Sequence, residues 1–379
     1  MLVFWLKGSV YLIRARRTVG AGGIALNLAA LALACGGGSP TAPTAQWNSG
    51  SPTAAVMSCP SAVQRQSVDA LPVLISWNLP TVAGIPVDKG SCVPISGTAF
   101  SIGASTVTCS ADQPTLASSC TFSIMIAPPD PKLRFTRFMA FGNSITEGFI
   151  REFLPTGVTA GEIPALLRTA AGRRLLGIYT AVQPLNSYPT QLRNLLAPAY
   201  LTQQISVANE GLGGEFTSEG VSRLTSALLS VQPEVLLLFE GFNDINRAIN
   251  STPEDDPPIS IAPIAANLRA MALDARGRGI EVLLATMTPV ADLYESQVPG
   301  TRAAIVELNA AILSMAAELA LGGVVDLYGA LVGTPGLFGP DGFHPNTTGY
   351  RRIAETFASE IVSRYDVTPQ PPVSTALVQ

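Results

Sequence analysis

The feature that most constrains the fold is an alternation of strand-like and helix-like segments over residues 132–366. Short apolar runs typical of buried strands are separated by longer segments whose apolar residues recur at helical spacing. The strand-like runs are Phe138–Phe141, Ile205–Ala208, Val235–Phe239, Val282–Thr286 and Val324–Asp326. The helical segments are Tyr188–Leu196, Glu219–Ser230, Ile264–Ala275, Arg302–Leu321 and Thr347–Ser363. This alternation predicts an α/β domain in which helices cover both faces of a parallel sheet.

Composition restricts the classes of protein to which the chain can belong. With 379 residues, of which 47% are hydrophobic and 13% charged, it can hold two globular domains with sizeable cores. The net charge is −4 and no basic cluster lies outside the N-terminus, so nucleic acid is not an expected partner. His344 is the only histidine, which excludes a three-histidine zinc site. We therefore expect neither a metal ion nor a cofactor.

Residues 1–35 have the pattern of an export signal. Arginines at positions 14, 16 and 17 precede an apolar run, Val19–Ala34, which ends at Cys35. The sequence Leu-Ala-Leu-Ala-Cys resembles a bacterial lipoprotein signal, although Ala32 stands where such signals usually carry Leu. The resemblance implies that Cys35 is lipidated and tethers the protein to a membrane; a plain cleaved signal and an uncleaved anchor are the alternatives. We expect an exported protein, either a periplasmic or cell-surface lipoprotein or a secreted one.

Two segments have the composition of chains without a core. Residues 36–52 are rich in Gly, Ser, Pro and Thr, which predicts a flexible linker. Residues 367–379 form a polar tail with several prolines, which predicts disorder.

Residues 53–128 contain the other four cysteines, Cys59, Cys92, Cys109 and Cys120. An even number of cysteines in one short segment of an exported chain predicts two disulfides. Zinc is the alternative, but no CxxC pair is present and the spacings are long. Alternating runs separated by Gly and Pro predict a small β-sandwich.

The same segment resembles a hyalin-repeat (HYR) module. The likeness rests on the four cysteines, on Trp77 with Pro80, and on the run from Cys92 to Phe100. It implies an immunoglobulin-like β-sandwich with a role in adhesion, and it implies the pairing Cys59–Cys120 and Cys92–Cys109. Since no polar constellation here suggests chemistry, we expect a spacer or a binding domain.

Polar residues follow the predicted strands of the α/β domain, where open parallel sheets place their active sites. The segments are Gly142-Asn143-Ser144, Asn209–Gly214, Glu240–Asp244 and Gly339–Pro345. Each alone could be a turn or a helix cap. Together they supply the groups that acyl transfer requires, which favours a catalytic interpretation.

Acyl transfer by a serine needs these residue types for definite reasons. Ser144 requires a base to take its proton, and His344 is the only imidazole available. Asp341, three residues before His344, can accept the Nδ1–H and fix the tautomer. The N–H groups of Ser144 and Gly214 and the Asn243 amide could bind the oxyanion, where one donor typically contributes about 3 kcal/mol.

At these residues the chain resembles the SGNH (GDSL-type) hydrolases. The segments that carry the resemblance are FGNSITEG, NEGLGGE, EGFND and DGFHPNTTGY, within roughly residues 132–366. It implies a flavodoxin-like α/β/α sandwich with Ser144 as nucleophile, and with Asp341 and His344 completing the triad. It also implies an oxyanion hole made by Ser144, Gly214 (rather than Gly211) and Asn243.

Three features bear on that resemblance. Asn143 replaces the aspartate of the family motif, which leaves the nucleophile intact and affects only supporting hydrogen bonds. No G-x-S-x-G motif surrounds Ser144, which argues against an α/β-hydrolase fold. Two insertions, Phe149–Leu185 and Arg247–Ile261, are either ordinary surface segments or parts of a lid or pocket wall.

The sequence thus predicts a serine esterase or lipase that hydrolyses carboxylic esters. The alternative on the same site is a polysaccharide O-deacetylase or O-acetyltransferase, and the expected substrate is accordingly a small-molecule or polysaccharide ester. A non-catalytic adhesion protein is disfavoured because all the catalytic residue types are present.

Overall fold

The computed structural model describes residues 56–87, 91–113, 116–151, 157–177, 180–250 and 261–372. The predicted export signal, the lipidation site Cys35 and the linker 36–52 lie outside the described residues, as does most of the predicted C-terminal tail. In the described part of the chain, no helix combines the length and apolar character that crossing a membrane requires.

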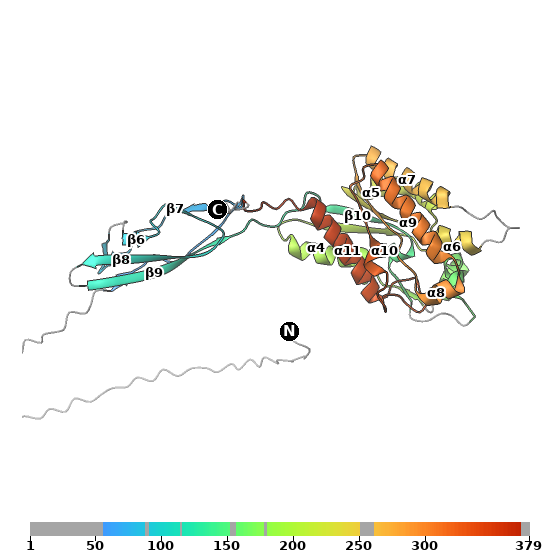
Figure 1. The fold of residues 1–379 in the computed structure, drawn as a ribbon, viewed down its shortest axis with the longest axis horizontal. Helices are drawn as coiled ribbons and strands as arrows, with labels where there is room; N and C mark the ends of the chain where they lie inside the picture. Colours follow the sequence, from blue (N-terminus) through green and yellow to red (C-terminus); the bar gives the residue numbers. More distant parts are fainter. Residues whose placement is uncertain are drawn as a thin grey trace, which may run out of the picture. The chain divides into compact units, whose positions relative to one another are not determined.

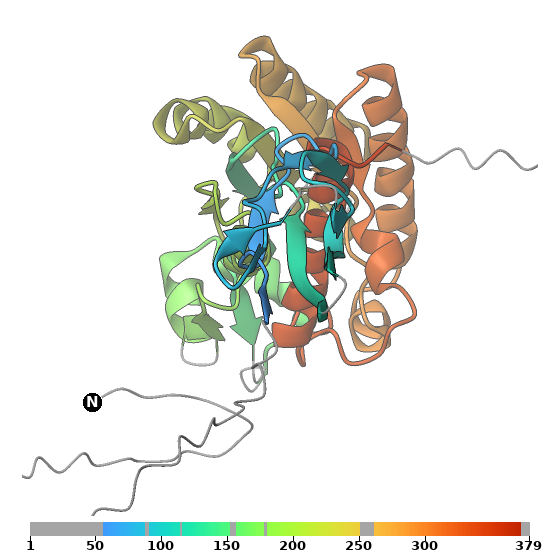
Figure 2. The same ribbon diagram turned by 90° about the vertical axis from the view of Figure 1, so that its left-hand side faces the viewer.

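The first part of the described chain is a small β domain, coloured blue to teal in Figures 1 and 2. Its strands are β1 (Met57–Ser58), β2 (Val63–Gln66), β3 (Val73–Ile75), β4 (Thr81–Val82), β5 (Ile85–Pro86), β6 (Cys92–Val93), β7 (Thr98–Phe100), β8 (Gly103–Gln113) and β9 (Leu116–Ala127). They form a four-stranded sheet in the order β2-β9-β8-β6, a three-stranded sheet β1-β4-β5 and a pair β3-β7. All pairs are antiparallel except β2 with β9.

One apolar cluster joins the strands of these sheets. Met57, Ile75, Phe100, Val107 and Ile124 are buried in it, and they come from β1, β3, β7, β8 and β9. Disulfides join Cys59 to Cys120 and Cys92 to Cys109, the pairing that the HYR resemblance implies. Two cross-links and a shared core compensate for the small size of this domain.

The α/β domain is built on a five-stranded sheet in the order β13-β10-β14-β15-β16. Its strands are β10 (Arg137–Gly142), β13 (Ser206–Gly211), β14 (Val235–Phe239), β15 (Glu281–Ala285) and β16 (Gly323–Val325), and all of them are parallel. Numbered along the chain, this is the order 2-1-3-4-5 of the flavodoxin-like fold. The predicted parallel sheet and fold class are confirmed.

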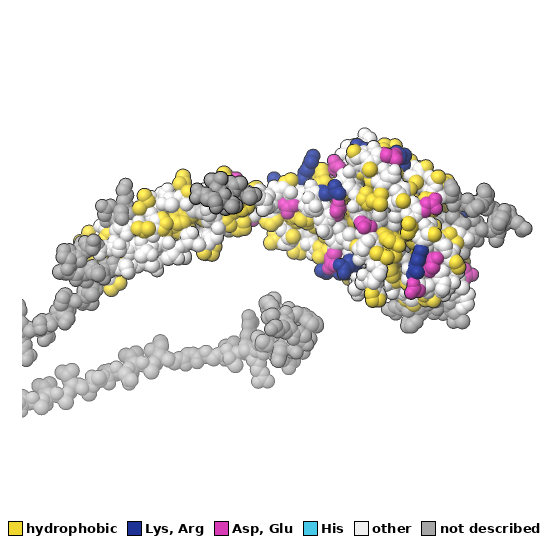
Figure 3. All heavy atoms as spheres, in the orientation of Figure 1, with side chains coloured by type: hydrophobic (Ala, Val, Ile, Leu, Met, Phe, Trp, Pro, Cys, Tyr) yellow, Lys and Arg dark blue, Asp and Glu magenta, His cyan; other side chains and the backbone are white. Residues whose placement is uncertain are grey.

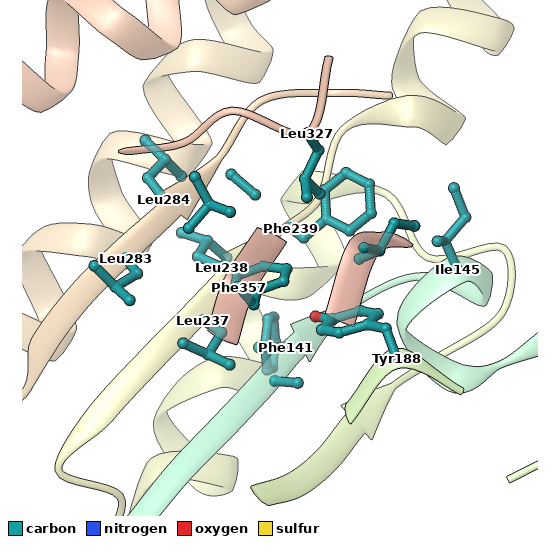
Figure 4. Packing of buried hydrophobic residues seen from close by; sticks show 14 of the residues in the cluster. Phe141, Ile145, Tyr188, Leu237, Leu238, Phe239, Leu283, Leu284, Leu327 and Phe357 are labelled. Carbon is teal, nitrogen blue, oxygen red and sulfur yellow. The ribbon is translucent and has the colours of Figure 1, made fainter. Parts of the chain in front are cut away.

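Helices cover both faces of this sheet (Figure 1). On one face lie α4 (Tyr188–Ala199) and α11 (Thr347–Tyr365), and on the other lie α5 (Thr217–Val231), α7 (Ile261–Gly277) and α9 (Thr301–Glu318). Every residue of the central strand β14 is buried. Figure 4 shows its side chains Leu237, Leu238 and Phe239 packed among residues of the neighbouring elements.

Several short elements are present that the sequence analysis does not predict. The helices α1 (Ser144–Glu147), α6 (Phe242–Asn250), α8 (Asp292–Gln297) and α10 (Leu327–Leu331) each span one to three turns. The first insertion contains β11 (Phe149–Arg151), the 3₁₀ turn η2 (Ala160–Glu162), α2 (Ile163–Leu167), α3 (Ala170–Gly177) and β12 (Thr180–Val182). Segments this short show too few turns for a helical period to be read from the sequence.

The start of the predicted C-terminal tail is hydrogen bonded. The N–H of Val367 donates to Lys132 O at 2.8 Å, and the N–H of Lys132 donates to Thr368 Oγ1, also at 2.8 Å. These bonds tie the residues after α11 to the segment that leads into the α/β domain.

Candidate active site

Ser144 lies two residues after the end of β10 and is the first residue of α1. Asn143 is the N-cap of α1, and its Oδ1 accepts a hydrogen bond from the N–H of Ile145 at 3.1 Å. Gly142 must be a glycine because a Cβ there would lie 2.1 Å from Phe239 O of the neighbouring strand. The strand end and the cap thus fix the backbone from which the Ser144 side chain projects.

Ser144, His344 and Asp341 form a continuous hydrogen-bonded chain. Ser144 Oγ lies 2.8 Å from His344 Nε2, and His344 Nδ1 lies 2.7 Å from Asp341 Oδ2. The other oxygen, Asp341 Oδ1, accepts the N–H of His344 at 3.1 Å and that of Phe343 at 3.3 Å. With its proton on Nδ1, the imidazole donates to Asp341 and accepts the hydroxyl hydrogen of Ser144 at Nε2.

Aromatic rings surround the imidazole of His344. Phe149 stacks on it with ring centroids 6.0 Å apart, and Phe343 contacts it at 3.9 Å. Phe343 in turn stacks on Phe242 of α6 at 4.7 Å and packs edge-on against Tyr294 of α8 at 5.1 Å. His344 is completely buried, and no histidine is visible on the face shown in Figure 3. This packing limits the orientations that the imidazole can adopt.

The three predicted oxyanion donors come from three segments that follow β10, β13 and β14, at the same edge of the sheet. Within the described residues, no hydrogen bond from the backbone N–H of Ser144 or Gly214 is formed. Gly214 has a φ of +78°, a backbone conformation that favours glycine. Asn243 Nδ2 donates to Glu215 O at 2.8 Å, which uses one of its two amide hydrogens and ties α6 to the Gly214 loop.

The domain that carries this site matches a known family. The family model described as the GDSL-like Lipase/Acylhydrolase family matches residues 140–352, which include all five predicted catalytic and oxyanion residues. The chain belongs to this family. It is therefore a hydrolase that acts on ester bonds.

Solved structures resemble the chain at low identity. A lipase/acylhydrolase from Enterococcus faecalis is 23% identical, covers 61% of this chain and 97% of its own, and has a TM-score of 0.41. Est24, a carbohydrate acetylesterase from Sinorhizobium meliloti, is 17% identical, covers 60% and 99%, and has a TM-score of 0.44. A GDSL-like lipase from Bacteroides thetaiotaomicron is 18% identical, covers 60% and 88%, and has a TM-score of 0.39. The chain has no match among curated proteins.

Three ionisable side chains, Glu215, Arg223 and Glu240, form a group close to the Gly214 loop of the hydrolase. The carboxylate of Glu215 is buried and accepts two hydrogen bonds from Arg223, at 2.6 and 2.7 Å. Glu240 is also fully buried, and neither of its carboxyl oxygens has a partner among the described residues. Burial, together with the nearby carboxylates of Glu215 and Asp244, raises the pKa of Glu240 well above its ordinary value.

A cavity of about 430 Å³ adjoins Asn243. Its size falls in the range of small-molecule sites, about 300–1,000 Å³. One wall comes from the first insertion, through Thr159, Gly161, Glu162, Ala165 and Arg168. The remaining lining residues are Phe216, Asn243, Asn246, Arg247, Gln297 and Val298. The first insertion therefore lines a cavity next to the predicted oxyanion site.

The described part of the chain holds no group of three or more His, Cys, Asp and Glu side chains that could bind a metal ion.

The sequence analysis did not find three contributors to the site: Glu147, Arg168 and the Glu215–Arg223 pair. Each acts through a contact between distant segments, so no local motif marks it. The acidic residue in NSITEG was the one available signal, because an ionisable side chain one helical turn after a nucleophile faces the same edge of the sheet.

Proposed function

We propose that Ser144 is the nucleophile of a serine esterase, with His344 as general base and Asp341 as the residue that orients the histidine. One observation carries this proposal. The only histidine of the chain lies 2.8 Å from Ser144 Oγ through Nε2 and 2.7 Å from Asp341 Oδ2 through Nδ1. This geometry is that of a nucleophile, its base and the group that holds the base.

The reaction follows from these roles. His344 Nε2 takes the proton of Ser144 while Oγ bonds the ester carbonyl carbon and the carbonyl oxygen becomes an oxyanion. The tetrahedral intermediate collapses, the bond to the alcohol breaks, and His344 gives its proton to the leaving oxygen. Water then attacks the acylated Ser144 and loses a proton to His344. Release of the acid returns that proton to Oγ.

The oxyanion would be bound by three donors, the N–H groups of Ser144 and Gly214 and the side-chain amide of Asn243. In support, both N–H groups lack a partner within the described residues, and Asn243 has a second amide hydrogen. Donors fixed before the reaction stabilise the developing charge without reorganisation. Hydrolysis of p-nitrophenyl acetate by the wild-type protein and by Ser144→Ala is the experiment that tests the proposal.

A second candidate is O-deacetylation of a polysaccharide, or acetyl transfer if an alcohol replaces water in the second step. Four side chains of the cavity beside Asn243 favour it, because Asn246, Arg247 and Glu162 could hydrogen bond to a hydroxylated alcohol and the ring of Phe216 could pack against it. A few polar groups placed in a mostly apolar cavity can fix the orientation of such an alcohol.

This second candidate predicts a short-acyl preference. We expect acetate release from acetylated xylan, and a kcat/KM that falls at least tenfold from p-nitrophenyl acetate to p-nitrophenyl octanoate, because a long acyl chain would bury the charged and amide side chains of the cavity without hydrogen bonding to them. Titration of released acid across the acyl series measures it. A kcat/KM that rises with chain length would show a lipase instead.

We also propose that the protein is exported and anchored at a membrane through a lipidated Cys35, with residues 53–128 serving as an HYR-like spacer or binding domain. The arginines before an apolar run that ends at Cys35, and the two disulfides of the β domain, support export. A pure adhesion role is the least favoured alternative. We expect globomycin to cause accumulation of the full-length precursor, detected as a mobility shift; no shift in the presence of the drug would exclude lipidation.

A further inference from the structure

We propose that Glu147 is a positioning residue that holds the oxyanion loop, residues 211–215, in its active conformation. The inference rests on the proposed function, in which the N–H of Gly214 binds the oxyanion. Glu147 belongs neither to the triad nor to the three proposed donors. It would act through the backbone of Gly213.

The loop needs an external constraint because of its sequence. It contains Gly211-Leu212-Gly213-Gly214, and glycine has the greatest backbone freedom of any residue. An oxyanion donor is effective only within a narrow range of distance and direction, and a misplacement of about 1 Å can cost on the order of a hundredfold in rate. A loop with adjacent glycines at the donor position must therefore be held by its surroundings.

Glu147 supplies this constraint on the amino-terminal side of Gly214. Its Oε2 accepts the N–H of Gly213 at 2.7 Å, a short hydrogen bond to a carboxylate. Among the described residues, this carboxylate is the only hydrogen-bond partner of that N–H. The bond fixes the peptide immediately before the one that carries the Gly214 N–H.

The same residue connects the loop to the nucleophile. Glu147 is the last residue of α1 and Ser144 is the first, so one helical turn separates them. The backbone of Glu147 also presses against the loop, because a Cβ on Gly211 would lie 2.1 Å from Glu147 N. Glu147 thus sets the spacing between two of the proposed donors, the N–H groups of Ser144 and Gly214.

The carboxyl-terminal side of Gly214 is held by other charged and polar groups. Arg168 Nη1 donates to Gly214 O at 3.3 Å, and Asn243 Nδ2 donates to Glu215 O at 2.8 Å. The ion pair between the buried Glu215 and the partly buried Arg223 fixes the following side chain. The Gly213–Gly214 peptide therefore lies between two constraints, and Glu147 is the side chain that provides the first.

The test compares Glu147→Ala with Glu147→Gln, which keeps a hydrogen-bond acceptor at nearly the same position. We expect Glu147→Ala to lower kcat for p-nitrophenyl acetate about 10- to 100-fold with KM changed less than about threefold, since the hydrogen bond from Gly214 to the oxyanion, which the loop conformation supports, forms only in the transition state. We expect Glu147→Gln to keep kcat within about threefold of wild type. An equal loss in both variants would overturn the proposal.

A second readout separates positioning from a general structural effect. In the thionoester analogue, sulfur replaces the carbonyl oxygen, and the sulfur anion accepts N–H bonds more weakly than an oxyanion does. Glu147→Ala should therefore lower the rate on the thionoester several-fold less than the rate on the oxygen ester. Equal losses on the two substrates would contradict a role in the oxyanion hole.

Two further variants complete the experiment. In Glu234→Ala, the control, the carboxylate removed also accepts backbone N–H bonds, from Thr136 at 2.8 Å and Arg137 at 3.0 Å, but at the opposite end of β10. It should leave kcat unchanged. In Gly213→Ala, the new Cβ would lie 2.9 Å from Glu147 Oε2 and should displace it, which gives a second variant if Glu147→Ala does not fold. The Cβ would also lie 3.0 Å from Phe149 Cε2, so the thionoester comparison on this variant separates loss of the loop constraint from displacement of the ring beside His344.

The variants distinguish a failure of the Glu147 proposal from a failure of the proposed function. If Ser144→Ala is inactive and Glu147→Ala has wild-type kcat, the inference about Glu147 is wrong and the proposed function stands. If Ser144→Ala is as active as wild type, the proposed function is wrong and the inference falls with it.

Discussion

Replacement of Ser144 or His344 by alanine lowers kcat for p-nitrophenyl acetate about a hundred-thousandfold or more, and the double variant loses no more than either single one. The two residues act as one unit, because Oγ without Nε2 has no base and Nε2 without Oγ has no nucleophile. Losses from such a unit do not add. The residual rate above that in water should come from substrate binding and the oxyanion donors, which both variants retain.

Single-turnover measurements of p-nitrophenol release by the wild-type, single and double variants check this prediction. Ser314→Ala is a suitable control, since Ser314 is exposed on α9 and bonds only to Glu318 among the described residues. Its kcat should equal that of wild type. If Ser144→Ala kept a tenth of the wild-type rate, another nucleophile would be at work. A double variant much slower than both single ones would mean that the two residues act independently.

The sheet was predictable because its inner strands, β10, β14 and β15, are buried on both faces. A strand such as β14 reads as a continuous apolar run, and its predicted and observed bounds, Val235–Phe239, coincide. The short helices were not predictable in this way. α6 was read as the loop Glu240–Asp244 with a possible helix cap, because its first residues, Phe242-Asn243-Asp244, are mostly polar and its apolar side chains contact elements far away in the sequence.

The candidate site residues could be predicted from the sequence for a different reason. A chain with one histidine leaves a single candidate base, and an aspartate three residues earlier suits a tight turn. The supporting contacts had no such signal. Phe149 stacks on His344 across almost 200 residues of sequence, and Glu147 reaches Gly213 across a separation of 66. Only the packing of β10, β13 and the last loop brings these pairs together.

Asp341→Asn is expected to lower kcat about ten-thousandfold while leaving the fold intact. The reason lies in how the two carboxylate oxygens are used. Asp341 Oδ1 accepts two backbone N–H groups, from Phe343 and His344, so the asparagine must keep its oxygen there. Its NH₂ group then faces His344 Nδ1, which has to accept a hydrogen bond in place of donating one. The imidazole proton moves to Nε2, and Nε2 can no longer take the proton of Ser144.

Because His344 is the only histidine, ¹⁵N-histidine labelling reports this tautomer without overlap from other residues. The wild-type spectrum should show the proton on Nδ1, and the Asp341→Asn spectrum should show it on Nε2. Asp326→Asn is a matched control: Asp326 Oδ1 also accepts a backbone N–H, that of Gly329 at 2.9 Å, but its carboxylate contacts no imidazole. It should change neither kcat nor the tautomer. A large loss of kcat in Asp341→Asn with the proton still on Nδ1 would contradict this explanation. It would mean that the negative charge of Asp341 stabilises the imidazolium, and that packing against Phe149 and Phe343 orients the ring.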